Sequence, residues 1–235
     1  MAGLARFRLF NHWTGLGLLR LGQFRRVTPI SQAWGFDRGL PIDRYYIEKF
    51  LAGHAQDIRG HVLEIMDSNY TVRFGGNRVQ KKDVLHSSND NPAATIVADL
   101  THAEQIPSNI FDCIILTQTL LFIYDARAAI NTLARILKPG GTVLGTVPGI
   151  TKISREDMQR SGQYWSFTTL SIQRLFEEAF SAKQVKVEAH GNVLTAAAFL
   201  YGPAAGELRK AELDHQDPDY EVVITFRAVK PGLSC

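Results

Sequence analysis

The sequence has few cysteines and lacks the motifs of several well-defined chemistries. Only two of its 235 residues are cysteine, Cys113 in an apolar stretch and Cys235 at the last position, which excludes a disulfide framework and suggests a reducing cytoplasm. The seven histidines show no zinc spacing and there is no C-x-x-C pair, so we expect no metal site. The signatures of serine hydrolases, P-loop proteins and dinucleotide-binding enzymes, G-x-S-x-G, G-x-x-x-x-G-K-[ST] and G-x-G-x-x-G, do not occur either.

Long hydrophobic runs are also missing. No stretch reaches the roughly 18 apolar residues needed to span a bilayer. The short run at residues 16–22 is interrupted by Arg20 and lacks a small-residue cleavage site after it, which argues against a signal peptide. The hydrophobic fraction of 45% and the charged fraction of 21% instead favour a globular chain with a sizeable buried core. The length fits one α/β domain with additions.

The net charge of +3 is unevenly distributed. Residues 1–36 contain five arginines and no acid, so the rest of the chain is slightly acidic. A slightly acidic domain does not favour nucleic-acid binding, which needs a basic face. The basic N-terminal stretch fits either a solvated arm packed across the domain or a peripheral contact with an anionic membrane surface. Nothing in the sequence indicates the oligomeric state.

Strand-forming runs that carry a carboxylate occur three times in the middle of the chain. Residues 62–65 contain Glu64, residues 79–84 contain Asp83, and Asp99 follows residues 95–98. The ends of parallel strands meet at one edge of a sheet, where acids can bind the hydroxyl and amino groups of a nucleoside. We expect further strands at residues 111–117, 142–147, 185–188 and 220–227.

Helical periodicity separates some of these strands. Apolar residues recur at three- and four-residue intervals in residues 42–51, in the stretch that begins at Asp125, and in residues 171–180. The run Pro139-Gly140-Gly141 is typical of a helix stop and should turn the chain into the fifth strand. The alanine-rich residues 194–213 favour a helix by propensity alone.

This order resembles a class I S-adenosylmethionine (SAM)-dependent methyltransferase, of the methyltransferase type 11-like group. The resemblance covers about residues 38–230, and its most specific part is Phe111-Asp112-Cys113-Ile114-Ile115 followed by Leu137-Lys138-Pro139-Gly140-Gly141, which is similar to the family's FDxV and LKPGG motifs. Residues 36–48 are similar to the opening segment of a subgroup found near bacterial glycosyltransferases.

The resemblance implies an α/β fold: one Rossmann-like, seven-stranded, mostly parallel sheet with helices on both faces, its last strand antiparallel in the sheet interior. Residues 41–235 would form this domain and residues 1–40 an N-terminal arm or lid. One family element is absent. The turn after the first strand is usually rich in glycine, so that backbone N–H groups can approach SAM. Here it reads Ile65-Met66-Asp67-Ser68-Asn69, with no glycine until Gly75.

The resemblance also implies a set of cofactor-binding residues. Glu64 would contact the amino group of SAM or, as an alternative, brace its own loop, and Asp67 would bind the ammonium group. Asp83 lies 19 residues after Glu64, close to the interval of roughly 20 residues at which nucleotide folds place their ribose-binding acid. Asp99 with Leu100 would receive the adenine. The full expected set is Arg38, Tyr46, Glu64, Ile65, Met66, Asp67, Asp83, Val84, Asp99, Leu100, Gln118 and Thr119.

The acceptor side is expected after the fourth and fifth strands. Tyr164, Trp165 and Phe167 offer aromatic faces on which a sugar or ring could stack, or they belong to the core. Leu120-Leu121-Phe122 replaces a histidine-containing segment common in the family, so the general base must lie elsewhere. Candidates are Tyr124, Asp125, His102, His86 and His190.

The implied function is O-methylation of a small molecule or of a sugar or glycoconjugate hydroxyl, with SAM as the cofactor. The alternative is a non-catalytic or SAM-repurposing protein with the same fold, which the missing glycines and the missing histidine favour. A third possibility is a membrane-surface or glycan-associated module that uses the basic arm.

Overall fold

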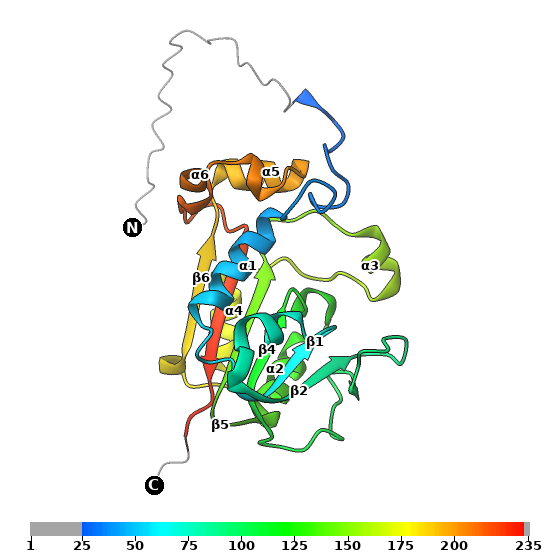
Figure 1. Cartoon of the computed structure of the whole chain (residues 1–235), viewed down its shortest axis with the longest axis vertical. Helices are drawn as coiled ribbons and strands as arrows, with labels where there is room; N and C mark the ends of the chain where they lie inside the picture. Colours follow the sequence, from blue (N-terminus) through cyan, green and yellow to red (C-terminus); the bar gives the residue numbers. More distant parts are fainter. Residues whose placement is uncertain (1–24, 233–235) are drawn as a thin grey trace, which may run out of the picture.

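The computed structural model describes residues 25–232, in which seven strands form one mixed sheet between two layers of helices (Figure 1). The strand order is β3-β2-β1-β4-β5-β7-β6; β7 is antiparallel to both of its neighbours and the other pairs are parallel. The expected fold is therefore confirmed, including the antiparallel last strand inside the sheet. The strands are β1 (Gly60–Ile65), β2 (Val79–His86), β3 (Ile96–Val97), β4 (Phe111–Thr117), β5 (Leu137–Pro148), β6 (Val185–His190) and β7 (Val223–Val229).

Helices cover both faces of the sheet. Because neighbouring residues of a strand point in opposite directions, each strand contributes side chains to both cores. Leu63 and Ile114 pack into a core with α2 and α4, whereas Val62 and Cys113 pack into a second core with α1 and α5. Strands buried on both faces read as continuous apolar runs, as the central strands here do. The helices are α1 (Ile42–Gly53), α2 (Ala126–Ile136), α3 (Arg155–Arg160), α4 (Thr169–Glu177), α5 (Val193–Tyr201) and α6 (Lys210–Asp214), with short helical turns η2 (Thr71–Gly75), η3 (Gly76–Arg78), η4 (Leu120–Phe122), η5 (Ala182–Gln184) and η6 (Ala205–Glu207).

Several boundaries differ from the sequence-based expectation. β2 continues two residues further, to His86, and β5 already begins at Leu137, before the Pro-Gly-Gly run. The alanine-rich residues 194–213 do not form one helix. α5 ends at Tyr201. The C-cap Gly202 has a left-handed φ of 88°, which terminates the helix, and Pro203 cannot continue it. The helix α3 was not expected.

The described part of the N-terminal arm is fastened to the body of the domain. The backbone N–H of Ile30 donates to the Tyr201 carbonyl oxygen over 2.7 Å, and that of Ala205 donates to Leu40 over 2.7 Å. A Cβ atom on Gly202 would lie 2.6 Å from the Ser31 carbonyl oxygen, so the segments around Ser31 and Gly202 are in close contact. Residues 1–24, which carry most of the predicted lid, lie outside the described residues. No helix within residues 25–232 is long and apolar enough to cross a membrane.

Candidate cofactor and acceptor site

The strand order reverses between β1 and β4, at the centre of the sheet. In open α/β sheets ligands bind outside the carboxyl ends of the strands at such a switch point. The residues that follow these two strands, Met66 after β1 and Gln118 after β4, both have positive φ values, 77° and 47°. Non-glycine residues rarely adopt this conformation, and it is concentrated at functional sites. Backbone strain therefore marks the same edge that topology indicates.

The turn after β1 is braced by Glu64, the buried acid near the end of that strand. Its Oε1 accepts the backbone N–H of Tyr70 over 3.1 Å, and its Oε2 accepts that of Thr71 over 2.7 Å. Glu64 thus holds the start of the helical segment after the turn, which corresponds to the bracing alternative. Burial raises the pKa of Glu64 to about 7, and the hydrogen bonds from Thr71 and Tyr70 only partly oppose this.

The turn itself fits a cofactor despite its missing glycines. Met66 adopts the left-handed conformation that glycine favours, so the backbone follows a path that normally needs glycine. Its N–H donates to the Leu85 carbonyl oxygen over 3.0 Å, and its own carbonyl oxygen accepts Nδ2 of Asn91 over 2.6 Å. The side chain of Met66 is 55% exposed. The turn is therefore fixed by hydrogen bonds to β2 and to the loop after it.

Asp83 does not lie where the spacing predicted. It pairs in register with Leu63 and lies three residues before the end of β2, away from the carboxyl edge. His61 Nε2 lies 2.6 Å from its Oδ2, and Thr95 Oγ1 donates to its Oδ1 over 2.8 Å. Burial acts to raise the pKa of Asp83, but the hydrogen bonds from His61, Thr95 and Lys81 outweigh burial and hold that pKa below its ordinary value.

His86 occupies the end of β2 instead. The sequence reasoning named it only as a candidate general base and placed it outside the strand. Its ring is buried, and the loop after it is tied across the edge of the sheet: Arg160 Nη2 on α3 donates to Asp90 Oδ2 over 2.8 Å. The apolar pair Val84-Leu85 continuing the run beyond Asp83 is the sequence signal that could have revealed the longer strand.

Other expected cofactor residues lie at this edge with local partners. Asp67 caps its own turn, accepting the N–H of Asn69 over 2.8 Å. Asp99 accepts the N–H and the hydroxyl of Thr101, each over 2.8 Å, in the turn after β3. Thr119 donates to the Thr117 carbonyl oxygen over 3.0 Å. Ile65 ends β1, Val84 lies inside β2, and Leu100 is buried in the core beside Asp99.

Two expected cofactor residues are not brought to the edge. Arg38 donates through Nε to Glu207 over 2.9 Å, next to α5 and α6. Tyr46 is buried under α6, where its hydroxyl donates to the Leu213 carbonyl oxygen over 2.9 Å. From the same opening segment, Arg44 reaches the turn after β1, where its Nη1 donates to the Tyr70 hydroxyl oxygen over 3.1 Å.

An exposed aromatic cluster follows β4 and β5. Tyr124 is 72% exposed; its ring stacks on Trp165 with centroids 6.0 Å apart and meets Tyr164 edge-on at 5.3 Å. Trp165 Nε1 donates to the Ile123 carbonyl oxygen over 3.0 Å, which fixes the indole on the segment after β4. Phe167 is buried in the core behind Trp165 and is not part of the exposed face.

The expected general-base candidates do not lie together. His190 ends β6, with its Nε2 2.9 Å from Thr225 Oγ1. Tyr124 and Asp125 are adjacent, and Asp125 caps α2 by accepting the N–H of Ala128 at Oδ1 over 2.9 Å. His102 follows β3 at the edge of the sheet, with its Nδ1 2.8 Å from Thr101 Oγ1. Within residues 25–232 no group of three or more histidine, cysteine, aspartate or glutamate side chains could hold a metal ion.

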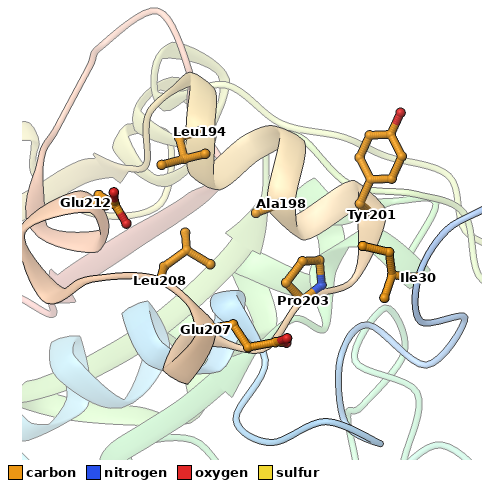
Figure 2. Close-up of a pocket in the computed structure, with 8 residues that line it drawn as sticks. All are labelled: Ile30, Leu194, Ala198, Tyr201, Pro203, Glu207, Leu208 and Glu212. Atoms are coloured by element: carbon orange, nitrogen blue, oxygen red, sulfur yellow. The ribbon is translucent and has the colours of Figure 1, made fainter. Parts of the chain in front are cut away.

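A pocket of about 370 Å³ lies elsewhere, between α5 and the segment that follows it (Figure 2). Its lining is mainly apolar and includes no strand residue. Both of its carboxylates are engaged, Glu207 by Arg38 over 2.9 Å and Glu212 by Arg209 Nε over 2.8 Å. The pocket therefore offers little chemistry, and the carboxyl edge of the sheet remains the candidate site. Its lining residues are Ile30, Leu194, Ala198, Tyr201, Pro203, Glu207, Leu208 and Glu212.

Comparison with known proteins agrees with the fold. Residues 51–145 match the family model of a methyltransferase domain, and no curated protein matches the sequence. The chain is similar to the N-methyltransferase NodS from Bradyrhizobium japonicum, with a TM-score of 0.51 and 15% identity over 83% of this chain and 90% of the other. It is similar to a SAM-dependent methyltransferase from Archaeoglobus fulgidus, with a TM-score of 0.51 and 12% identity over 80% of this chain and 90% of the other. It is also similar to the [4+2]-cyclase SpnF, with a TM-score of 0.51 and 16% identity over 77% of this chain and 81% of the other.

At these identities the structural likeness establishes the fold alone. Together with the domain match over residues 51–145, it shows that the chain has the α/β fold of SAM-dependent methyltransferases. The matched segment runs from the end of α1 into β5 and contains Met66, His86 and Gln118. The match and the unusual backbone geometry thus fall on the same part of the chain.

Proposed function

We propose that this protein binds SAM at the carboxyl edge of β1, β2 and β4 and transfers its methyl group to a hydroxyl of a small molecule or glycan. SAM supplies an electrophilic methyl group, so alignment of the acceptor accounts for much of the rate. The observation that carries the proposal is the exposed aromatic cluster of Tyr124, Tyr164 and Trp165 next to the turn at Gln118. Such a face stacks on the apolar side of a sugar or ring.

An acceptor hydroxyl must lose its proton as its oxygen takes the methyl group. Asp125 stands beside Tyr124, and its Oδ1 is used by the N–H of Ala128. Among the described residues its Oδ2 accepts no hydrogen bond, so this atom can hold the proton. His102 lies in the turn after β3, where it forms a backbone bridge with Asp99 and its Nδ1 lies 2.8 Å from Thr101 Oγ1. In the proposal this turn belongs to the adenine side. We therefore favour Asp125 as the general base and Tyr124 as a positioning group.

A second candidate function is a SAM-binding protein that does not transfer methyl groups. The glycine-free turn and the absence of a histidine after β4 favour it, and one of the similar structures is a cyclase. Fold alone does not decide between these chemistries.

The test is to titrate the full chain with SAM and with S-adenosylhomocysteine (SAH) by calorimetry. The protein is then incubated with SAM and glycosides, nucleosides or phenols, and the products are read by mass spectrometry. Methyl transfer predicts a methylated acceptor and an equal amount of SAH. Binding without any product across the panel supports the second candidate, and no binding of either nucleoside contradicts both.

A further inference from the structure

We propose that His86, and not Asp83, binds the ribose hydroxyls of the nucleoside cofactor. The inference rests on the proposed function and names a binding residue within it. His86 is the last residue of β2. Its neighbour Leu85 pairs with Ile65 at the end of β1 and accepts the N–H of Met66 over 3.0 Å. His86 therefore lies beside the turn after β1, where the ribose of a nucleotide fold is bound by an acid on the second strand.

The imidazole of His86 is held through one nitrogen. Its Nδ1 lies 3.0 Å from the Ser88 carbonyl oxygen, 3.2 Å from the Ser88 hydroxyl and 3.3 Å from Asp90 Oδ1. The Ser88 N–H donates to Nδ1 over 3.3 Å. Asp90 is in turn fixed by Arg160 on α3, and the loop is tied to the first turn by the bond from Asn91 to Met66. The ring orientation is thus set by three connected segments.

These contacts assign the proton of the neutral ring to Nδ1. Two oxygens that only accept face this nitrogen, the Ser88 carbonyl at 3.0 Å and Asp90 Oδ1 at 3.3 Å, against one donor, the Ser88 N–H at 3.3 Å. The two acceptors, of which the carbonyl is the nearest atom, outweigh the single donor. An unprotonated Nδ1 would point its lone pair at the lone pairs of these two oxygens, which is unfavourable. With the proton on Nδ1, the other nitrogen, Nε2, carries a lone pair and accepts hydrogen bonds.

Nε2 of His86 also has access to the outside. It makes no hydrogen bond within residues 25–232. The buried side-chain polar atoms without a partner in this range are the hydroxyl oxygens of Thr71 and Thr146, so Nε2 is not a buried orphan. The residual exposure of His86, 7%, is enough for an atom at the tip of the ring to meet a ligand.

The chemistry matches that of the acid it replaces. A carboxylate on the second strand accepts hydrogen bonds from ribose hydroxyls, and Nε2 of His86 accepts one such bond. Asp83 cannot take this role as well, because its oxygens already receive His61, Thr95 and Lys81 in the middle of the strand. One acceptor in place of two predicts a modest but measurable contribution to affinity.

The first experiment measures SAH affinity of the full chain by calorimetry for variants at position 86. His86→Leu should weaken SAH binding about 5- to 30-fold, the scale of one lost hydrogen bond that leaves a hydroxyl unpaired. His86→Gln places an acceptor near Nε2 and should retain most of the affinity. His86→Asn places its amide near Nδ1 and should bind as weakly as His86→Leu. The matched control His215→Leu, exposed after α6, should bind like the wild type.

The second experiment uses an SAH analogue whose ribose lacks both hydroxyls. The wild type should prefer SAH over this analogue about 5- to 30-fold, and His86→Leu should lose most of that preference. Unchanged SAH affinity in His86→Leu, or full discrimination retained by it, overturns the inference while leaving the proposed function intact. Failure of the wild type to bind SAH overturns the proposed function and the inference with it. A normal thermal transition in His86→Gln and His86→Asn guards against misfolding.

Discussion

Two histidines on neighbouring strands show how differently the two ends of this sheet are used. His61, near the start of β1, and Asp83 on β2 satisfy each other over 2.6 Å, and Thr95 completes the set. We call these three residues the inner cluster. His86, at the end of β2, is held on one side only, by Ser88 and Asp90, and keeps a nitrogen available for a ligand.

The backbone at the carboxyl edge is also unusual. We call Met66, Gln118 and His86, the last residue of β2, the outer edge. Met66 and Gln118 both have positive φ values. Strained backbone persists where the surrounding structure fixes it, and it is concentrated at binding sites. The comparison teaches that the inner cluster holds the strands together, whereas the outer edge is organised for binding.

The largest expected effect concerns Glu64, which lies between the two regions. Its raised pKa means that the folded state holds the proton more tightly than the unfolded state, so stability falls as pH rises from about 4.5 to about 7. Glu64→Gln removes this loss. Between pH 4.5 and pH 7, the free energy of unfolding of Glu64→Gln should therefore rise by about 3 kcal/mol relative to that of the wild type, as measured by urea unfolding. The exposed Glu104→Gln should show no such change, and parallel curves for Glu64→Gln and wild type would contradict the raised pKa.

The next effect breaks the inner cluster. Asp83→Asn removes the charge that accepts from His61 and Thr95, and should lower the free energy of unfolding by about 2 kcal/mol at pH 7. Because the folded pKa of Asp83 is lowered, its stabilisation is present above the unfolded pKa of about 4 and is lost as pH falls through the folded value. The difference between variant and wild type should thus shrink in acid. The exposed Asp219→Asn is the control, and an equally stable Asp83→Asn at pH 7 would argue against a structural role.

A smaller effect tests the acceptor side of the outer edge. Trp165→Ala removes the ring that stacks on Tyr124 and should lower kcat/KM for the acceptor about 10-fold, close to 1.4 kcal/mol, with SAH affinity unchanged. Leu170→Ala, an exposed apolar change on α4, should leave kcat/KM at the wild-type level. A loss of SAH affinity in Trp165→Ala would place the indole on the cofactor side instead.

The smallest effect probes the strained turn. Met66→Gly relieves a left-handed non-glycine residue and should raise the free energy of unfolding by about 0.5–1 kcal/mol, without weakening SAH binding. Met158→Gly, in the helix α3, should do the opposite, because glycine destabilises a helix interior. A destabilised Met66→Gly would show that the methionine side chain, and not the backbone path, holds the turn.

Sequence reasoning reached the fold because the fold depends on repeated patterns. Apolar runs, helical periodicity and the segment from Phe111 to Gly141 each predicted an element that the structure contains. Gly202-Pro203 is a helix-breaking pair that the sequence contains, but the prediction of one helix over residues 194–213 gave more weight to the alanine content around it. The helix α3 has no apolar periodicity and could not be predicted from pattern.

The site was less predictable because it depends on register. Residue spacing favoured Asp83, but a strand that runs two residues further moves Asp83 inward and puts His86 at the end. The positive φ of Met66 could not be predicted from the sequence either. The missing glycines suggested that the turn after β1 has a different backbone conformation, whereas Met66 adopts the conformation that glycine favours. Tyr124 and Trp165 were predicted singly, and only the fold stacks one on the other.

The most direct test of the account measures SAH affinity and thermal stability for His86→Leu and Asp83→Asn in parallel. The account predicts that His86→Leu binds SAH about 5- to 30-fold more weakly with a nearly unchanged Tm, whereas Asp83→Asn binds SAH like the wild type with a clearly lowered Tm. The reverse pattern, weak binding in Asp83→Asn and wild-type binding in His86→Leu, would contradict the division between the inner cluster and the outer edge.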